Sequence, residues 1–228
     1  MDAIAAIANP FAGLGADFLL SAAEIQQRLG SVRAFVFDWD GVFNDGRKGE
    51  SAPSTFSEPD SMGTNMLRYA YWRARGGLPI CAVISGAHNP TARTFATREH
   101  FDAVYCGYSD KGTAFDALCK QSSLSRAHIA YVFDDVNDLG PARGCALRFL
   151  VRRNASPLLR EFTATHGLVD YVTAASAGQY PVREVSELLL GLLGGYPEAF
   201  DSRSRSDEEY QAYFAARQAV QTSVVDAH

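Results

Sequence analysis

The chain has 228 residues, of which 47% are apolar and 21% are charged, and its formal net charge at pH 7 is −5. These proportions are typical of one globular α/β domain with a complete hydrophobic core. The negative net charge provides no overall basic field, so we expect no nucleic-acid partner and no attraction to anionic lipid. The sequence has no apolar span of about 20 residues and no Lys or Arg early in residues 1–30, so we expect neither a membrane helix nor a secretory signal.

Helices and strands are expected to alternate along most of the chain. Continuous apolar runs are typical of buried parallel strands, which we expect at 34–37, 79–85, 103–106, 129–134, 147–151 and 171–172. Helices are expected at 21–29, 60–75, 90–100, 111–121, 156–163 and 182–193. This alternation predicts an α/β fold with a Rossmann-like open parallel sheet and helices on both of its faces.

Two segments interrupt or follow this alternation. Residues 42–57 are rich in Gly, Ser and Pro and are too short for a cap domain, so they predict a flap beside a catalytic domain that spans residues 1–193. Residues 194–228 predict a linker followed by a helical tail, because Gly194-Gly195 and Pro197 precede a capping-box pattern that starts at Ser206. The aromatic face of that helix would pack on its own domain or dock on a neighbouring subunit.

The four cysteines give an expectation about the cellular compartment. Cys81, Cys106, Cys119 and Cys145 form no Cys-x-x-Cys pair and lie in or beside apolar stretches. Such residues are typical of reduced structural thiols, which predicts a cytoplasmic protein without disulfides.

The triplet Asp38-Trp39-Asp40, which directly follows the expected strand at 34–37, is the main clue to chemistry. Side chains alternate along a strand, so both carboxylates are expected on the same side, where their mutual repulsion calls for a cation or a shared proton. Gly41 then allows a sharp turn. This pattern favours a hard cation and a covalent carboxylate reaction, although Asp-x-Asp-Gly also occurs in ordinary surface turns.

Other polar groups follow other expected strands and favour the functional interpretation. Ser85-Gly86 follows the strand at 79–85, Lys111 comes soon after the strand at 103–106, and Asp134, Asp135 and Asp138 follow the strand at 129–134. The carboxyl ends of parallel strands meet at one edge of a sheet, where ligands bind. The sequence therefore predicts one site built from all of these groups.

The order of these motifs resembles the haloacid dehalogenase superfamily of phosphotransferases. In that superfamily an Asp-x-Asp motif, a Ser or Thr, a Lys and an acidic motif occur in this order, matched here by Asp38 with Asp40, Ser85, Lys111, and Asp134 with Asp138. Over about residues 32–193 the chain is similar to the 3-deoxy-D-manno-octulosonate 8-phosphate phosphatase branch. The segments that carry this similarity are 38–46, 56–63, 107–111, 130–135 and 182–184.

The resemblance implies a mechanism and a set of roles. Asp38 would be the nucleophile that forms an aspartyl-phosphate, and Asp40 the general acid and base. The cofactor would be Mg²⁺, held by Asp38, the backbone carbonyl of Asp40 and Asp134, with Asp135 or Asp138 orienting its shell. Phosphate would be bound by Ser85, Gly86 and Lys111. Candidate substrate contacts are Asp60, His88 and Arg183.

Departures from the family pattern concern the substrate more than the chemistry. The family's Thr, Gly and Arg are replaced by Asn44, Ser61 and Ala87, and Phe133 stands where a Gly precedes the acidic motif. With Ala87 in place of an arginine that would bind an anionic group, we expect octulosonate 8-phosphate to be a poor substrate.

The function expected from the sequence is a phosphoric monoester hydrolase that acts on a small phosphorylated metabolite, a sugar or sugar-acid phosphate. A phosphotransferase or mutase on the same scaffold, or a non-catalytic regulatory or binding homologue, are the alternatives. The resemblance further implies a homo-oligomer, with a tetramer expected, because a minimal-cap enzyme has little of its own protein with which to close the site.

Overall fold

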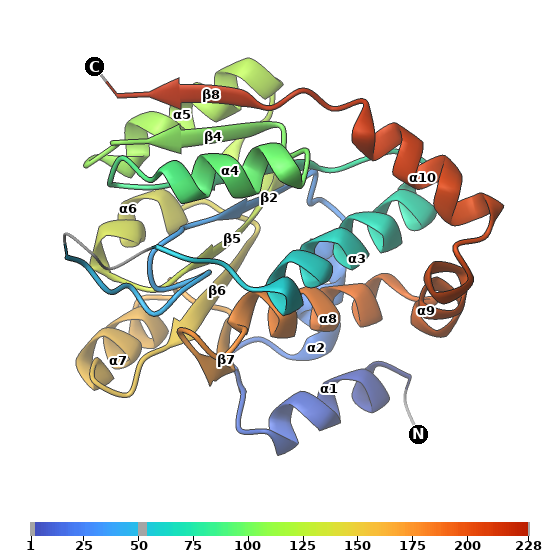
Figure 1. The fold of residues 1–228 in the computed structure, drawn as a ribbon. Coiled ribbons are helices and arrows are strands. Elements are labelled where there is room, and N and C mark those ends of the chain that lie inside the picture. Colours follow the sequence, from blue (N-terminus) through green and yellow to red (C-terminus); the bar gives the residue numbers. More distant parts are fainter. Residues whose placement is uncertain (1–2, 50–53, 228) are drawn as a thin grey trace.

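The computed structural model describes residues 3–49 and 54–227, and its centre is an eight-stranded sheet (Figure 1). The strand order is β1-β7-β6-β5-β2-β3-β4-β8, and every neighbouring pair is parallel except β1 with β7. The predicted open parallel α/β sheet is therefore confirmed. The strands are β1 Asp17–Phe18, β2 Ala34–Phe37, β3 Ile80–Ile84, β4 Ala103–Cys106, β5 Ile129–Phe133, β6 Leu147–Arg152, β7 Tyr171–Ser176 and β8 Ser223–Asp226.

Helices cover both faces of the sheet, as expected for a Rossmann-like fold. They are α1 Ala3–Gly13, α2 Ala22–Leu29, α3 Glu58–Arg75, α4 Pro90–Arg98, α5 Lys111–Ser122, α6 Leu139–Ala142, α7 Pro157–Thr165, α8 Pro181–Leu193, α9 Tyr196–Arg205 and α10 Glu208–Gln218. Two short 3-10 helices, η1 Arg126–His128 and η2 Val136–Asp138, flank β5.

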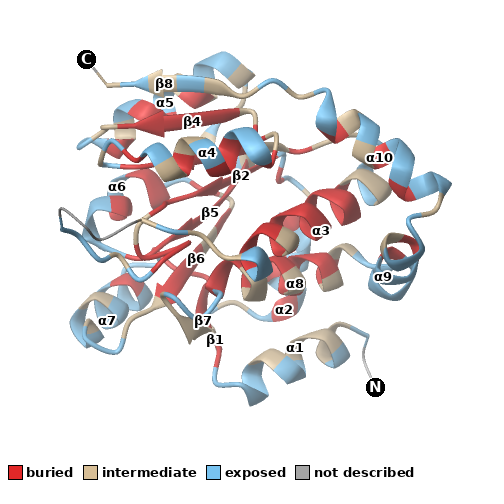
Figure 2. Cartoon of the chain, in the orientation of Figure 1, coloured by how far each residue is buried: buried red, intermediate tan, exposed pale blue. Residues whose placement is uncertain are grey.

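The central strand β2 shows how the two layers of the core arise. Phe35 and Phe37 point to one face, where they pack in a cluster with residues of α2, α3, α4 and α8. Ala34 and Val36 point to the other face and pack with residues of α5 and α6. All four residues are buried, as the continuous apolar run predicts for a strand covered on both sides (Figure 2).

The C-terminal residues are more structured than the sequence suggests. The stretch expected to be a linker forms helix α9, so that expectation is wrong. The predicted helix is present as α10, although its N-cap is Asp207, which accepts a hydrogen bond from the backbone N–H of Tyr210, and not Ser206. After α10 the chain returns to the sheet as β8, which pairs in parallel with β4 (Figure 1). This edge strand was not predicted.

The aromatic face of α10 packs on its own domain. Tyr210 and Tyr213 are buried against Met66, Tyr69 and Ala70 of α3, and the hydroxyl of Tyr213 donates a hydrogen bond to the backbone oxygen of Asn65 at 2.9 Å. Of the two alternatives left open by the sequence, the structure shows packing within the chain.

Three further expectations meet the structure in different ways. Residues 50–53 of the expected flap at 42–57 lie outside the described residues, as does His228 of the tail. All four cysteines are free, and Cys81, Cys106 and Cys145 are buried, as expected for structural thiols. Among the described residues no helix is both long enough and apolar enough to span a membrane.

Candidate active site

The carboxyl ends of β2, β3 and β5 bring the predicted site residues to one edge of the sheet. Asp38 follows β2, Ser85 follows β3, and Asp134 follows β5. Lys111 is the first residue of α5, and Asp138 ends η2. This is the arrangement expected for an open α/β sheet, in which ligands bind at the carboxyl ends of the strands.

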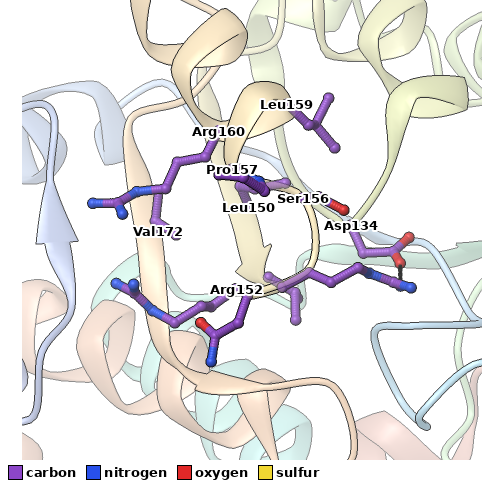
Figure 3. A pocket seen from close by; sticks show the side chains of 11 residues that line it. Asp134, Leu150, Arg152, Ser156, Pro157, Leu159, Arg160 and Val172 are labelled. Atoms are coloured by element: carbon purple, nitrogen blue, oxygen red, sulfur yellow. Dashed lines mark hydrogen bonds and ion pairs between the residues drawn. The ribbon is translucent and has the colours of Figure 1, made fainter.

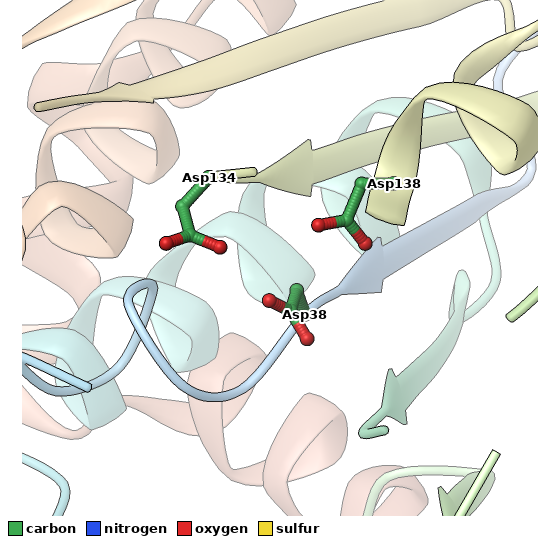
Figure 4. A group of neighbouring side chains, drawn as sticks. All are labelled: Asp38, Asp134 and Asp138. Carbon is green, nitrogen blue, oxygen red and sulfur yellow. The ribbon is translucent and has the colours of Figure 1, made fainter. Parts of the chain in front are cut away.

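Asp38, Asp134 and Asp138 form a buried carboxylate cluster (Figure 4). Each offers one oxygen, and these oxygens all lie within 4.8 Å of one another. Lys111 partly balances the charge, because its Nζ lies 2.7 Å from Oδ1 of Asp38 and 2.6 Å from Oδ1 of Asp138. The hydroxyl of Tyr131, from β5, also donates a hydrogen bond to Asp138.

The electrostatics of the cluster follow from burial and crowding. Burial raises the pKa of Asp38 well above its ordinary value, and the nearby Asp138 and Asp134 raise it further, while Lys111 opposes them. Burial also raises the pKa of Asp134, to about 6, against the effect of Arg153. Burial alone would lower the pKa of Lys111, but Asp38 and Asp138 offset this and raise it. Lys111 and Arg153 are the cations paired with these three crowded carboxylates, and the uncompensated negative charge favours the binding of another cation.

The residues present fit a magnesium ion. All three carboxylates supply hard oxygen ligands, which Mg²⁺ prefers. Oδ2 of Asp138 is buried and has no hydrogen-bond partner within the described part of the chain, so it has an acceptor position to offer. Gly41 has a φ of +88°, and a Cβ at this position would collide with the Asp134 carboxylate, so only glycine allows this close approach.

Asp40 lies near this cluster but has different partners. Its Oδ2 accepts a hydrogen bond from Nδ2 of Asn89 at 2.9 Å and forms an ion pair with Lys48, and its Oδ1 accepts one from Oγ of Ser54 at 3.2 Å. The main repulsion on Asp38 therefore does not come from Asp40, contrary to the expectation from the sequence. It comes from Asp138 and Asp134, the carboxylates that raise the pKa of Asp38.

A cavity of about 450 Å³ opens over these groups. Its lining includes the carboxylates of Asp38 and Asp40, the ammonium of Lys111, and Gly86 with Ala87 from the loop after β3. Ser85, which directly precedes Gly86, is buried. Its Oγ accepts hydrogen bonds from Nδ2 of Asn89 at 2.7 Å and from the backbone N–H of Ala87 at 3.3 Å.

The two candidates for orienting the metal shell occupy different places. Asp138 is completely buried within the carboxylate cluster. Asp135 lies at the exposed rim of the cavity, where its Oδ1 accepts a hydrogen bond from the backbone N–H of Val136 at 2.7 Å. The geometry thus favours Asp138, a choice that the sequence left open.

None of the three candidate substrate contacts is among the described residues that line the cavity. Asp60 is buried beside the start of α8, where its Oδ1 accepts a hydrogen bond from the backbone N–H of Arg183 at 2.9 Å. The side chain of Arg183 pairs with Glu187. His88 is exposed and its Nδ1 lies 3.6 Å from Asp226 of β8. Their role as substrate contacts stays a prediction.

Sequence reasoning missed several residues that contact the site. Arg153, which no motif connects to the site, forms an ion pair with Asp134. It also lines a second, small pocket of about 100 Å³ at the end of β6, in which Asp134, Arg152, Pro157 and Arg160 lie (Figure 3). Lys48, Ser54 and Asn89 were also missed, because no motif connects them to Asp40 and only the folded chain places them there.

Comparisons with known proteins give a consistent result. No family model matches the chain. The chain is 29% identical over 175 residues to 3-deoxy-D-manno-octulosonate 8-phosphate phosphatase KdsC of Haemophilus influenzae. The aligned region covers 75% of this chain and 89% of that protein.

Two solved structures are similar in both fold and sequence. One is the 3-deoxy-D-manno-octulosonate 8-phosphate phosphatase of Moraxella catarrhalis in complex with magnesium, phosphate and KDO, with a TM-score of 0.64, 27% identity, and coverage of 79% of this chain and 98% of that one. The other is the cobalt-bound deoxy-D-mannose-octulosonate 8-phosphate phosphatase of Haemophilus influenzae, with a TM-score of 0.63, 26% identity, and coverage of 76% and 99%.

Together with the sheet and its carboxylate cluster, these similarities confirm the resemblance that the motifs predict. The chain is a phosphatase, a hydrolase of phosphoric monoesters, and its carboxylate cluster fits a divalent metal ion. In fold and sequence it is similar to hydrolases of the HAD superfamily. Within that class it is similar to the 3-deoxy-D-manno-octulosonate 8-phosphate phosphatase branch.

Proposed function

We propose that this phosphatase uses Mg²⁺ to hydrolyse a small phosphorylated metabolite, a sugar or sugar-acid phosphate, through an aspartyl-phosphate on Asp38. The observation that carries the proposal is the cluster of Asp38, Asp134 and Asp138, which lies beside Lys111 in a cavity large enough for such a substrate. The magnesium and phosphate ions named for the Moraxella catarrhalis relative support the same chemistry.

The roles of the residues follow from their positions. Asp38, Asp134 and the backbone carbonyl of Asp40 would hold Mg²⁺, with Asp138 orienting its shell, and the bound ion would neutralise charge on the phosphoryl group. The carboxylate of Asp38 attacks phosphorus, and Asp40 gives a proton to the leaving alcohol. Asp40 then takes a proton from the water that hydrolyses the intermediate. Ser85, Gly86 and Lys111 hold the phosphoryl oxygens in place.

Substrate choice depends on the rim of the cavity. Ala87 lines the cavity and provides no charge, whereas Lys48 and Arg153 line it with cations that pair with Asp40 and Asp134. Because the family's arginine is absent at Ala87, we expect octulosonate 8-phosphate to be turned over more slowly than other sugar phosphates.

We further propose that the chain assembles into a homo-oligomer, with a tetramer as the expected form. The support is the open rim of the cavity, where Lys48, Asp135 and Ser109 are exposed and no inserted domain of the described chain covers them. The tail helix no longer supports this proposal, since its aromatic face is buried within the chain. Light scattering should give several times the mass of one chain, and a monodisperse monomer with full activity would refute the assembly.

The experiment that tests the proposed function is a panel of sugar and sugar-acid phosphates, assayed for released phosphate with and without Mg²⁺. We expect turnover only with the metal, and a preference for a substrate other than octulosonate 8-phosphate. Turnover that persists after chelation would contradict the metal chemistry. A clear preference for octulosonate 8-phosphate would contradict the argument from Ala87 and leave the reaction type intact.

A further inference from the structure

Asn89, a residue that no motif singles out, links two parts of the active site. It is the N-cap residue of α4, and only 6% of it is exposed. Its Nδ2 donates one hydrogen bond to Oδ2 of Asp40 at 2.9 Å and another to Oγ of Ser85 at 2.7 Å. These two bonds use both hydrogens of the amide nitrogen.

The orientation of this amide follows from the chemistry of its neighbours. Oδ2 of Asp40 is a hydrogen-bond acceptor here, so the nitrogen of Asn89, and not its oxygen, faces it. An asparagine at an N-cap position ordinarily accepts a hydrogen bond from the backbone of its own helix. Asn89 makes no such side-chain bond to α4. Its side chain is therefore directed to the active site instead of the helix that it begins.

The second bond also determines what Ser85 can do. A serine hydroxyl has two acceptor positions and one proton. In Ser85 the two acceptor positions receive the amide of Asn89 and the backbone N–H of Ala87. The proton is therefore left to donate toward a phosphoryl oxygen, which is the role proposed for this residue.

The other partners of Asp40 are weaker constraints. The Lys48 side chain is 60% exposed, and an ion pair in that setting contributes little because water screens it. The bond from Ser54 is longer, at 3.2 Å. The buried amide of Asn89 is thus the partner that best fixes where the Asp40 carboxylate lies.

We propose that Asn89 is a positioning residue that ties the acid–base carboxylate of Asp40 to the phosphate-binding loop through Ser85. The proposal rests on the proposed roles of Asp40 and Ser85. It predicts that loss of the amide impairs protonation of the leaving group more than any other part of the first chemical step.

Two esters of nearly the same shape separate this effect from a loss of folded protein. Phenyl phosphate has a leaving group that needs protonation, whereas para-nitrophenyl phosphate has a leaving group that departs readily without it. The value of kcat/KM reports the step in which the aspartyl-phosphate forms. The ratio of the two kcat/KM values is unaffected by the fraction of enzyme that is active, because that fraction cancels.

The variants are Asn89→Ala, which removes both donors, and Asn89→Leu, which keeps a side chain of similar size but has no polar hydrogen to donate. We expect each to lower kcat/KM for phenyl phosphate about ten-fold more than for para-nitrophenyl phosphate. The matched control is Asn65→Ala, which removes an equally buried amide that donates to Tyr210 in the contact with α10. It should lower thermal stability and leave the ratio at the wild-type value.

An unchanged ratio in both Asn89 variants would overturn the proposal, whether the overall rate falls or not. If the wild-type enzyme hydrolyses neither ester with Mg²⁺, the proposed function is overturned and this inference with it. A changed ratio in Asn65→Ala would show that any loss of packing has this effect, and would also overturn the proposal.

Discussion

Lys111 and Asp38 form a buried ion pair, in which Nζ lies 2.7 Å from Oδ1 of the carboxylate. The same nitrogen lies 2.6 Å from Oδ1 of Asp138, so one ammonium group serves two carboxylates that would otherwise repel each other. A buried ion pair of this kind is costly to break from one side, because the remaining charge has no water to solvate it.

We therefore expect Lys111→Met to destabilise the fold by about 3–5 kcal/mol at neutral pH. Part of this loss should be regained in acid, because burial and Asp138 raise the pKa of Asp38, so the Asp38 carboxyl takes up a proton on acidification and the repulsion is relieved. Urea unfolding at two pH values measures both effects. Lys120→Met, on the exposed end of the same helix α5, is the control and should change stability little. Equal stability of the two variants would contradict this account.

Metal binding should distinguish Asp138 from Asp135. Asp138→Asn removes a charge from the buried cluster, so we expect Mg²⁺ affinity to fall by about 10- to 100-fold. Asp135→Asn changes an exposed carboxylate that bonds to Val136, and its effect should be small. Isothermal titration of the two variants with Mg²⁺ makes the comparison without any substrate. A larger loss in Asp135→Asn would assign the role to that residue instead.

Asp60 should make stability depend on pH. Burial raises its pKa from 3.8 to about 6, against the hydrogen bonds from Ser57 and from the backbone of α8. Between these two values the folded state holds more protons than the unfolded state, so the stability contributed by this group falls as pH rises from about 4 to 6 and is then constant. The shift corresponds to about 2–3 kcal/mol at neutral pH.

Asp60→Asn can still accept from the backbone N–H of Arg183 but carries no charge. The free energy of unfolding of the variant minus that of wild type should therefore be about 2–3 kcal/mol larger at pH 7.5 than at pH 4.5. Denaturant unfolding at both pH values tests this. Asp116→Asn, which alters an exposed carboxylate on α5, controls for general charge effects. The prediction fails if the advantage of Asp60→Asn is the same at both pH values.

The parts of the fold that the sequence predicts are those with a strong local pattern. The run Ala34 to Phe37 is typical of a strand buried on both faces, and Gly76 after Arg75 ends α3 in the left-handed conformation expected of a C-cap glycine. By contrast, β8 has half-exposed residues and only one neighbour, so no continuous apolar run identifies it. Helix α9 was not predicted, because Gly195, Pro197 and the serines of 202–206 are typical of a linker, although Pro is well tolerated in a first helical turn.

The same division holds for the site. Asp38, Lys111 and Asp134 lie at the ends of predictable elements, so their proximity follows from the topology of a parallel sheet. Asn89 and Arg153 reach the site through the direction of their side chains, which no spacing in the sequence encodes. His88, a candidate substrate contact, has its Nδ1 3.6 Å from Asp226, on a strand that was not expected, and its role stays a prediction.

The central claim is that the reaction proceeds through an aspartyl-phosphate on Asp38. The most direct measurement is phosphopeptide mapping of the Asp40→Asn variant, quenched in acid shortly after mixing with para-nitrophenyl phosphate and Mg²⁺. This leaving group needs little protonation, and loss of the Asp40 base should slow hydrolysis of the intermediate, so the phosphoenzyme should accumulate. We expect one phosphoryl group on the peptide that contains Asp38, and none in Asp38→Asn treated in the same way. Turnover without any covalent phosphate, or phosphate on a different residue, would contradict the claim.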